Sequence, residues 1–256
     1  MFRWLIWILF CGLSNVSFAQ KIQLSPPKAN VQIAMVSKDH PQNLILDFRM
    51  EGATIRYTLD GNEPTLKSNR YQRPIKISKP CIIKVKAFHP DFDQSTTVTA
   101  TFVASGKKIL NYIVSDPNPK YADEGSKTMF DGQFGDMSYT KNYLGYDKGP
   151  VEITIQPDTA QVISNVHISH LINQGAWIFG PSKISVYDGN NKLLIQKNFE
   201  GSTQKQASNH NIITLTVPKT KYNQLKLVSE PKSSIPEWHD GRGLPAWFFV
   251  DEVWVE

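Results

Sequence analysis

The feature that most constrains the fold is a repeated alternation of apolar and polar residues with a period of two. Residues 54–59 read TIRYTL, residues 81–88 read CIIKVKAF and residues 97–102 read TVTATF. Because successive side chains of a β-strand point to opposite faces, this pattern predicts half-buried antiparallel strands. Long stretches with apolar residues at i, i+3, i+4 and i+7, which would indicate helices, are nearly absent. The sequence therefore predicts an all-β protein.

The alternation pauses near residues 104–108, which read ASGKK, and a second set of strand candidates follows. These candidates are residues 151–155, 165–172, 183–196, 212–217, 224–228 and 246–256. Within the third of them, the segment DGNN at 188–191 predicts a hairpin turn, because Asp, Gly and Asn tolerate positive φ. We therefore expect two β-sandwich domains, a small fibronectin- or immunoglobulin-like one over residues 20–105 and a larger one over residues 106–256.

A conspicuous corner interrupts the first domain where RYTLDGNEP occupies residues 56–64. A two-residue hairpin at Asp60-Gly61 would need a partner strand from Asn62, but Pro64 cannot donate to a strand ladder. We therefore predict that residues 60–73 form a loop and that the next strand starts at Pro74. Asp60 is expected to accept backbone N–H bonds that hold the corner, rather than to act as a catalytic acid or a metal ligand.

The N-terminus has the layout of a secretory signal peptide. An apolar stretch follows one basic residue and ends in small residues, with cleavage expected between Ala19 and Gln20. The stretch is shorter than the roughly 20 apolar residues that a membrane-spanning helix needs. Lipidation at Cys11 is the alternative, which bulky Phe10 disfavours. Residues 1–19 therefore predict export, to the periplasm, the cell surface or the medium, without a membrane span.

The remaining composition gives no sign of a redox, nucleic-acid or metallo-enzyme site. Cleavage leaves Cys81 as the one cysteine, so no intramolecular disulfide is expected, and no histidine follows it closely enough in sequence to suggest a catalytic thiol. The net charge of +5 is spread along the chain, without the block of like charges that would indicate nucleic-acid binding. His167 and His170 are three residues apart on a predicted strand, so they should face opposite sides and not share a metal.

Two pairs of adjacent acids are the remaining candidates for acid-base catalysis. Asp251 and Glu252 lie on a predicted strand, where neighbours point to opposite faces and cannot converge on one bond. Asp123 and Glu124 lie in a turn-rich stretch, where we expect a solvated surface pair. Neither pair predicts an enzyme.

Residues 53–102 resemble the small β-sandwich at the C-terminal end of bacterial chitobiases and β-hexosaminidases. The resemblance is carried by the corner YTLDGNEPT at 57–65, the segment YQRPI at 71–75 and the strand end VKAF at 85–88. In that family the module is an accessory to a catalytic barrel of about 250 residues. The resemblance therefore implies a non-catalytic role for a chain that two sandwiches already fill.

Residues 106–256 resemble the discoidin-like domain, also called the coagulation factor five/eight type C or galactose-binding-like fold, which is a jelly-roll sandwich. The carrying segments are KTMFDGQFGD at 127–136, YLGYDKGPVEITI at 143–155, GAWIFGPSKISVYDGNN at 175–191 and PEWHDGRGLPAWFFVDEVWVE at 236–256. The order of the two modules resembles the tails of certain exported bacterial hexosaminidases.

The second resemblance implies one structural Ca²⁺, held by an early Asp-Gly loop and by the last strand. Carried over by position, the ligands would be Asp131, Asp136 and Glu252 with carbonyl oxygens near Thr128 and Gln133. Calcium takes six to eight hard oxygen ligands, which suits this set. The alternative is that Asp131 only caps its turn and that Glu252 is a surface residue.

A sugar site needs an aromatic face for the C–H side of the ring and polar groups for its hydroxyls. Two loops offer them, and the candidates are Trp238, His239, Asp240, Arg242 and Trp247 in one and Asn173 and Trp177 in the other. For each single tryptophan a structural position in the core is the alternative, because tryptophan is usually largely buried.

We therefore expect a non-catalytic, exported carbohydrate-binding accessory protein that recognises hexosamine- or galactose-containing glycans through its C-terminal sandwich. The alternatives are a structural or protein-interaction module of a polysaccharide-utilisation system and a hexosaminidase-related chain that lacks the catalytic barrel. A glycan is the expected partner, nucleic acid is not, and the sequence identifies no protein partner.

Overall fold

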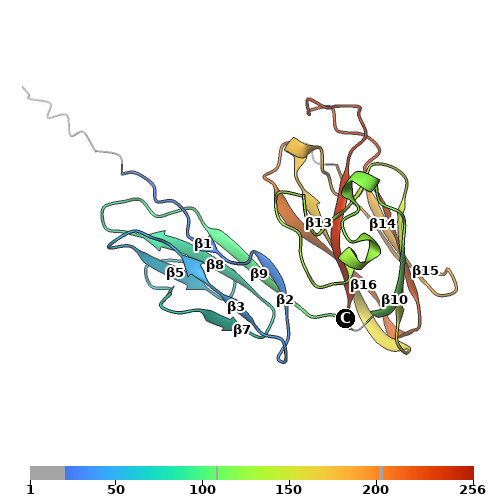
Figure 1. Ribbon diagram of the computed structural model, residues 1–256, viewed down its shortest axis with the longest axis horizontal. Coiled ribbons are helices and arrows are strands. Elements are labelled where there is room, and N and C mark those ends of the chain that lie inside the picture. Colours follow the sequence, from blue (N-terminus) through green and yellow to red (C-terminus); the bar gives the residue numbers. More distant parts are fainter. Residues whose placement is uncertain (1–20, 108, 202–203) are drawn as a thin grey trace, which may run out of the picture. The chain divides into compact units, whose positions relative to one another are not determined.

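The computed structural model describes residues 21–107, 109–201 and 204–256, and the predicted signal peptide at 1–19 lies outside these ranges. Strands dominate the described residues, and the helical segments among them are the short 3-10 turns η1 (Pro119–Tyr121), η2 (Gly125–Met129) and η3 (Gln174–Ala176) (Figure 1). The predicted all-β class is confirmed. No helix in these ranges is long and apolar enough to cross a membrane.

The strands before residue 105 form the first set. They are β1 (Lys28–Ala29), β2 (Ile33–Val36), β3 (Gln42–Leu44), β4 (Leu46–Asp47), β5 (Thr54–Thr58), β6 (Asn69–Arg70), β7 (Ile75–Ile77), β8 (Cys81–Phe88) and β9 (Val98–Ala104). The main sheet has the order β2-β9-β8-β5-β6, and β1-β4 and β3-β7 form two-stranded sheets. On β8 the alternate residues Ile83, Val85 and Ala87 are fully buried, as the sequence pattern predicts.

One pairing in this set differs from the antiparallel expectation, because β2 runs parallel to β9. A parallel pair needs a long connection, and the intervening strands supply it. The predicted loop also contains the two-residue strand β6, which pairs with Arg56 and Tyr57 of β5. The expectation that residues 60–73 lack strand structure is therefore wrong at Asn69 and Arg70.

The Asp-Gly corner has the predicted construction. The carboxylate of Asp60 accepts a hydrogen bond from the backbone N–H of Asn62 at 3.1 Å, and Gly61 has a φ of 76° that favours glycine. Beyond the corner, Glu63 accepts hydrogen bonds from Lys84 at 2.8 Å and Thr97 at 2.6 Å. These bonds, with Lys86 nearby, lower the pKa of Glu63 to about 2. The corner is thus a structural joint between the loop and β8.

The strands from residue 109 onward form a second set with antiparallel pairing throughout. They are β10 (Ile109–Val114), β11 (Leu144–Tyr146), β12 (Val151–Pro157), β13 (Gln161–Ile172), β14 (Lys183–Asp188), β15 (Leu193–Asn198), β16 (Asn209–Tyr222), β17 (Leu225–Glu230) and β18 (Phe248–Val255). One sheet has the order β10-β12-β17-β14-β15 and the other β11-β18-β13-β16. All six predicted strand candidates are present, with the predicted hairpin between β14 and β15.

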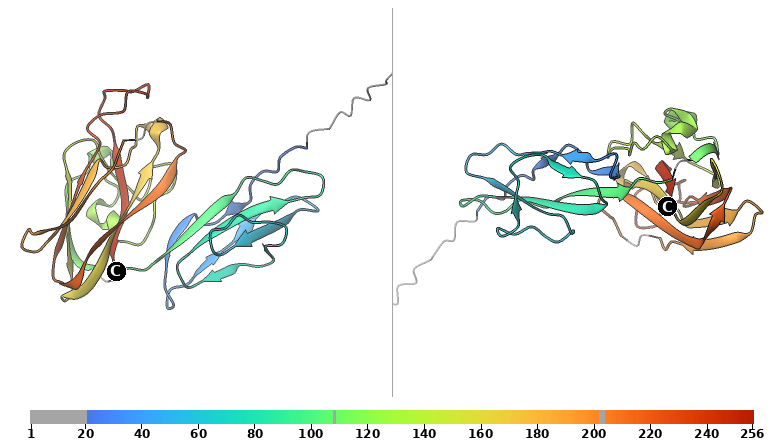
Figure 2. Two further views of the ribbon diagram at one scale, coloured as in Figure 1. Left: turned by 180° about the vertical axis from the view of Figure 1, so that it is seen from behind. Right: turned by 90° about the horizontal axis from the view of Figure 1, so that it is seen from below.

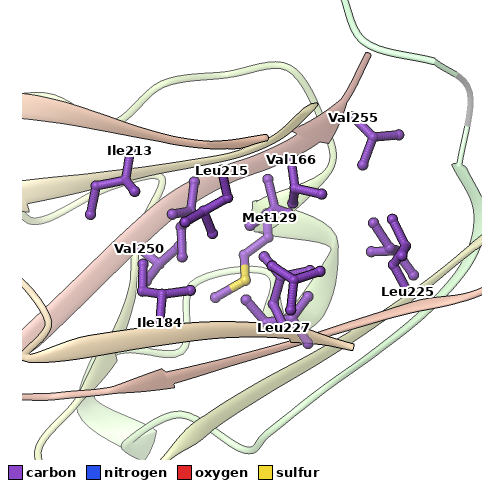
Figure 3. Close-up of a cluster of buried hydrophobic side chains, with 14 of the residues drawn as sticks. Met129, Val166, Ile184, Ile213, Leu215, Leu225, Leu227, Val250 and Val255 are labelled. Carbon is purple, nitrogen blue, oxygen red and sulfur yellow. The ribbon is translucent and has the colours of Figure 1, made fainter. Parts of the chain in front are cut away.

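A hydrophobic core fills the space between these two sheets (Figure 3). Ile184 and Leu227 come from the five-stranded sheet, Val166 and Val250 from the four-stranded sheet, and Met129 of η2 reaches in between them. Each of these side chains is fully buried, so the set is the principal source of hydrophobic stabilisation for this sandwich.

Contacts divide the chain into two compact units, each described by itself. Of the described residues, one unit holds 21–30, Ile45–Pro74 and Ile83–Thr99, and the other holds Val31–Leu44, Ile75–Ile82 and those from Ala100 onward. In Figure 2 the first set of strands runs from blue to green and the second from green to red. The predicted boundary at residues 105 and 106 stays a prediction.

Candidate functional site

The exposed aromatic residue of the predicted sugar site, Trp177, ends a tight turn that follows β13. The side chain of Asn173 accepts a hydrogen bond from the N–H of Ala176 at 3.3 Å, and its backbone exchanges two 3.0 Å hydrogen bonds with Ile178. Trp177 has a φ of 65°, a left-handed conformation that bulky residues rarely adopt. These bonds hold the tryptophan in that conformation, with 39% of its surface exposed.

A second loop, residues 235–247, fastens this turn from the side. His239 Nε2 donates to the carbonyl oxygen of Gln174 at 2.9 Å, because His239 Nδ1 accepts from the N–H of Gly241 at 3.0 Å. The N–H of Trp247 donates to the carbonyl of Trp177 at 2.9 Å. The two loops that the sequence singled out are thus joined by direct hydrogen bonds.

The indole of Trp177 packs on the backbone of Gly241. A Cβ atom added at Gly241 would lie 3.1 Å from Cε2 and 3.2 Å from Nε1 of that ring. Glycine therefore allows the close approach of this backbone to the indole. Asp240 and Arg242, on either side of this glycine, are exposed. We call Trp177 with Asp240, Gly241 and Arg242 the Trp177 platform.

The other tryptophans in the described ranges are less exposed. Trp238 is half-buried and packs against the cluster of Phe179, Ile235 and Ala246. Trp247 is half-buried and meets the ring of Phe249 at a centroid distance of 5.9 Å.

Trp254 is 4% exposed and stacks on His167 at 4.7 Å. Packing thus gives Trp238, Trp247 and Trp254 structural contacts, whereas Trp177 stays 39% exposed. Among the remaining predicted sugar-site residues, the side chains of Asn173 and His239 form hydrogen bonds within and between the two loops. Whether either of them contacts a ligand stays a prediction.

Two of the predicted calcium ligands lie together. Glu252, on β18, is 1% exposed, so the alternative that it is a surface residue is wrong. Its Oε1 accepts from the N–H groups of Gly132 at 2.6 Å and Gln133 at 3.0 Å. Burial, and next the neighbouring carboxylate of Asp131, raise the pKa of Glu252 to about 9. Asp131 also caps its own turn, accepting from Gln133 N–H at 2.8 Å.

Asp136, the third predicted calcium ligand, makes its hydrogen bonds elsewhere. Asp136 accepts from the backbone N–H of Ser138 at 2.9 Å, within its own turn. In the described ranges no three His, Cys, Asp or Glu side chains are grouped so as to hold a metal ion. Asp131 and Glu252 are hard oxygen donors that suit calcium, and further ligands would have to be loop oxygens.

A buried polar cluster beside this region was not identified from the sequence. Asp251 is fully buried, accepts from the N–H of Gly135 at 3.0 Å, and lies 3.5 Å from His210 Nε2. His210 also hydrogen-bonds Tyr143. Burial raises the pKa of Asp251 to about 6 and lowers that of His210 to about 4. The cluster ties Gly135 and Tyr143, in the segment that precedes β11, to the four-stranded sheet.

Neither pair of adjacent acids is arranged for acid-base catalysis. Asp251 and Glu252 bond different loop residues, Gly135 on one side and Gly132 and Gln133 on the other. Asp123 and Glu124 are exposed, as predicted.

Comparison with known proteins gives one family match. Residues 36–101 match the family described as the chitobiase/beta-hexosaminidase C-terminal domain. No curated protein matches the chain.

Matches to solved structures cover somewhat more than half of this chain. A Streptococcus pneumoniae fucose binding module has 13% identity and a TM-score of 0.37, with coverage of 57% of this chain and 92% of that one. CpGH89CBM32-5 from Clostridium perfringens, in complex with GalNAc-β-1,3-galactose, has 18% identity and a TM-score of 0.37, with coverage of 57% and 93%. The lectin binding domain of Lectinolysin, complexed with Lewis b, has 8% identity and a TM-score of 0.40, with coverage of 59% and 92%.

The family match spans the Asp-Gly corner and the strands β5 to β8, which are the segments that carried the first resemblance. It confirms that residues 36–101 resemble the chitobiase/β-hexosaminidase C-terminal domain family.

Proposed function

We propose that this protein is a non-catalytic, exported carbohydrate-binding accessory protein, and that it binds hexosamine- or galactose-containing glycans on the Trp177 platform. The observation that carries the proposal is an exposed tryptophan fixed by hydrogen bonds between two loops. The family match of the first sandwich to an accessory domain supports a non-catalytic role.

The chemistry of the platform suits a sugar. The C–H face of a pyranose ring packs on an indole, and galactose-type sugars present a continuous C–H face of that kind. Asp240 and Arg242 are the exposed neighbours of Gly241 in sequence, and they would supply acceptors and donors for hydroxyl or acetamido groups. Because the loops are already hydrogen-bonded to each other, little conformational entropy is lost on binding.

A glycan array with the purified chain tests the proposal. We expect binding to glycans with terminal or internal galactose or N-acetylhexosamine and no release of nitrophenol from nitrophenyl N-acetylglucosaminide. An absence of binding by folded protein would overturn the glycan proposal and favour a structural or protein-interaction module. Release of nitrophenol would overturn the non-catalytic assignment.

We also propose that Asp131 and Glu252 contribute to one structural Ca²⁺ site. The carboxylate of Asp131 raises the pKa of the buried Glu252, so a divalent cation beside the two carboxylates would offset their repulsion. The ion would connect the Asp131 loop to β18, which the Gly132 and Gln133 amides already do in part.

The calcium proposal predicts a cation-dependent melting temperature. At a hundredfold excess over Kd, Ca²⁺ should stabilise the folded protein by about 2.7 kcal/mol, which raises Tm by several degrees relative to EGTA. Glu252→Gln keeps the acceptor for the two amides and loses the charge, so its Tm should not respond to Ca²⁺. An equal Tm of the natural protein in Ca²⁺ and EGTA would contradict the proposal.

A further inference from the structure

A cavity of about 400 Å³ opens where β13 ends and β16 begins, and it shares no residue with the Trp177 platform. Its walls include His170, Gln174, Phe179, Gln206, Asn211 and Lys232. The volume lies within the range of small-molecule sites, which is roughly 300–1,000 Å³.

The most buried polar side chain of the cavity wall is His170, which is 1% exposed. Its Nε2 lies 3.4 Å from the side-chain Nδ2 of Asn211 and borders Gly180, where an added Cβ would come within 3.1 Å of it. Burial lowers the pKa of His170 to about 3, so the ring is neutral at physiological pH, with one nitrogen a donor and the other an acceptor. Its Nδ1 has no hydrogen-bond partner within the described ranges.

Side-chain amides supply the other polar groups of the wall. Gln174 is 2% exposed, and its Oε1 accepts from the backbone N–H of Gln206 at 2.7 Å. Asn211 pairs across the sheet with His170, so both side chains sit at the same level of the wall. An amide carries both donors and acceptors, which is the combination that a pair of adjacent hydroxyl groups requires.

The apolar and charged parts of the lining narrow the ligand class. Phe179 is 2% exposed and gives the cavity an apolar side. Lys232 and Glu200 bring charges of opposite sign, so the lining does not select a strongly charged ligand.

From this geometry, we propose that the cavity is a second binding site for a small, neutral, hydroxyl-rich ligand of monosaccharide size. The proposal does not depend on glycan binding at the Trp177 platform.

The test is a two-dimensional ¹⁵N NMR titration of the full chain with methyl galactoside, methyl N-acetylgalactosaminide and methyl fucoside. We expect at least one sugar to shift the signals of Gln174, Gly180 and Asn211 in a saturable manner. Asn211→Ala should weaken this binding at least about tenfold, which corresponds to roughly 1.4 kcal/mol. Asn209→Ala, an exposed change on the same strand outside the cavity, should leave it unchanged.

Trp177→Ala separates the two proposed sites, because it should weaken glycan binding at the Trp177 platform and leave these shifts in place. Gln206→Ala is a second cavity variant at an exposed position, in case Asn211→Ala lowers the melting temperature. Shifts confined to the Trp177 platform, or no saturable shift with any of the three sugars, would overturn the proposal. Equal affinities of the Asn211→Ala, Gln206→Ala and Asn209→Ala variants would also overturn it.

Discussion

Replacing Trp177 by alanine is expected to lower glycan affinity at least about 30-fold, which corresponds to roughly 2 kcal/mol, without unfolding the protein. The indole is the exposed aromatic face of the platform, with 39% of its surface accessible, and one side rests on Gly241. Truncation removes the surface on which a sugar ring would pack, and the backbone bonds of the turn do not require the side chain. Affinity is measured by calorimetry with the best ligand from the array.

Leu193→Ala is the matched control for this change. Leu193 is also a large apolar residue, 48% exposed, and it lies on β15 away from both loops. Its replacement should leave affinity and melting temperature nearly unchanged. If Trp177→Ala bound glycans as tightly as Leu193→Ala, the platform would not be the binding surface.

Several strands of both sandwiches could be predicted because their alternation is encoded locally. Ile83, Val85 and Ala87 alternate with polar residues and are buried as the alternation indicates. The strand β10, which reads ILNYIV, was missed because its apolar residues do not alternate regularly. It is an edge strand, paired on one side with β12, and Ile113 is 72% exposed there.

The candidate site was predicted at the level of its loops but not of its geometry. Sequence placed Trp177 and His239 among candidate sugar ligands, yet only the folded chain brings His239 against the carbonyl of Gln174, 65 residues away. The left-handed conformation of Trp177 has no signal in residue type, since glycine and asparagine are the usual residues there. Long-range contacts of this kind are invisible to periodicity.

The burial of the two acidic residues of β18 could not be predicted from the sequence. Alternation predicted opposite faces for Asp251 and Glu252, and the two do bond different loop residues. Composition alone favours surface positions for acids, yet both are buried. The loop amides of Gly132, Gln133 and Gly135 compensate part of the desolvation, and these partners are more than 110 residues away.

Phe248 and Phe249 give the second large prediction, because these neighbours on β18 belong to different clusters. Phe248 lies in the core between the two sheets, whereas Phe249 packs with Tyr143, Leu171 and Ile178. Each is 1% exposed, so replacement of either by alanine should lower the free energy of unfolding by about 3–5 kcal/mol. Urea unfolding monitored by circular dichroism measures this loss.

Replacement of Phe248 or Phe249 by leucine is a milder change than replacement by alanine. It allows glycan affinity to be compared in folded protein. Phe249 meets Trp247, and the N–H of Trp247 holds the carbonyl of Trp177, so Phe249→Leu should loosen the platform and weaken glycan binding several-fold. Phe248→Leu removes similar packing from the opposite face and should leave affinity within about twofold of the natural protein, because the platform keeps its support. If both variants lost the same glycan affinity at matched stability, the packing of Phe249 against Trp247 would have no specific part in holding the Trp177 platform.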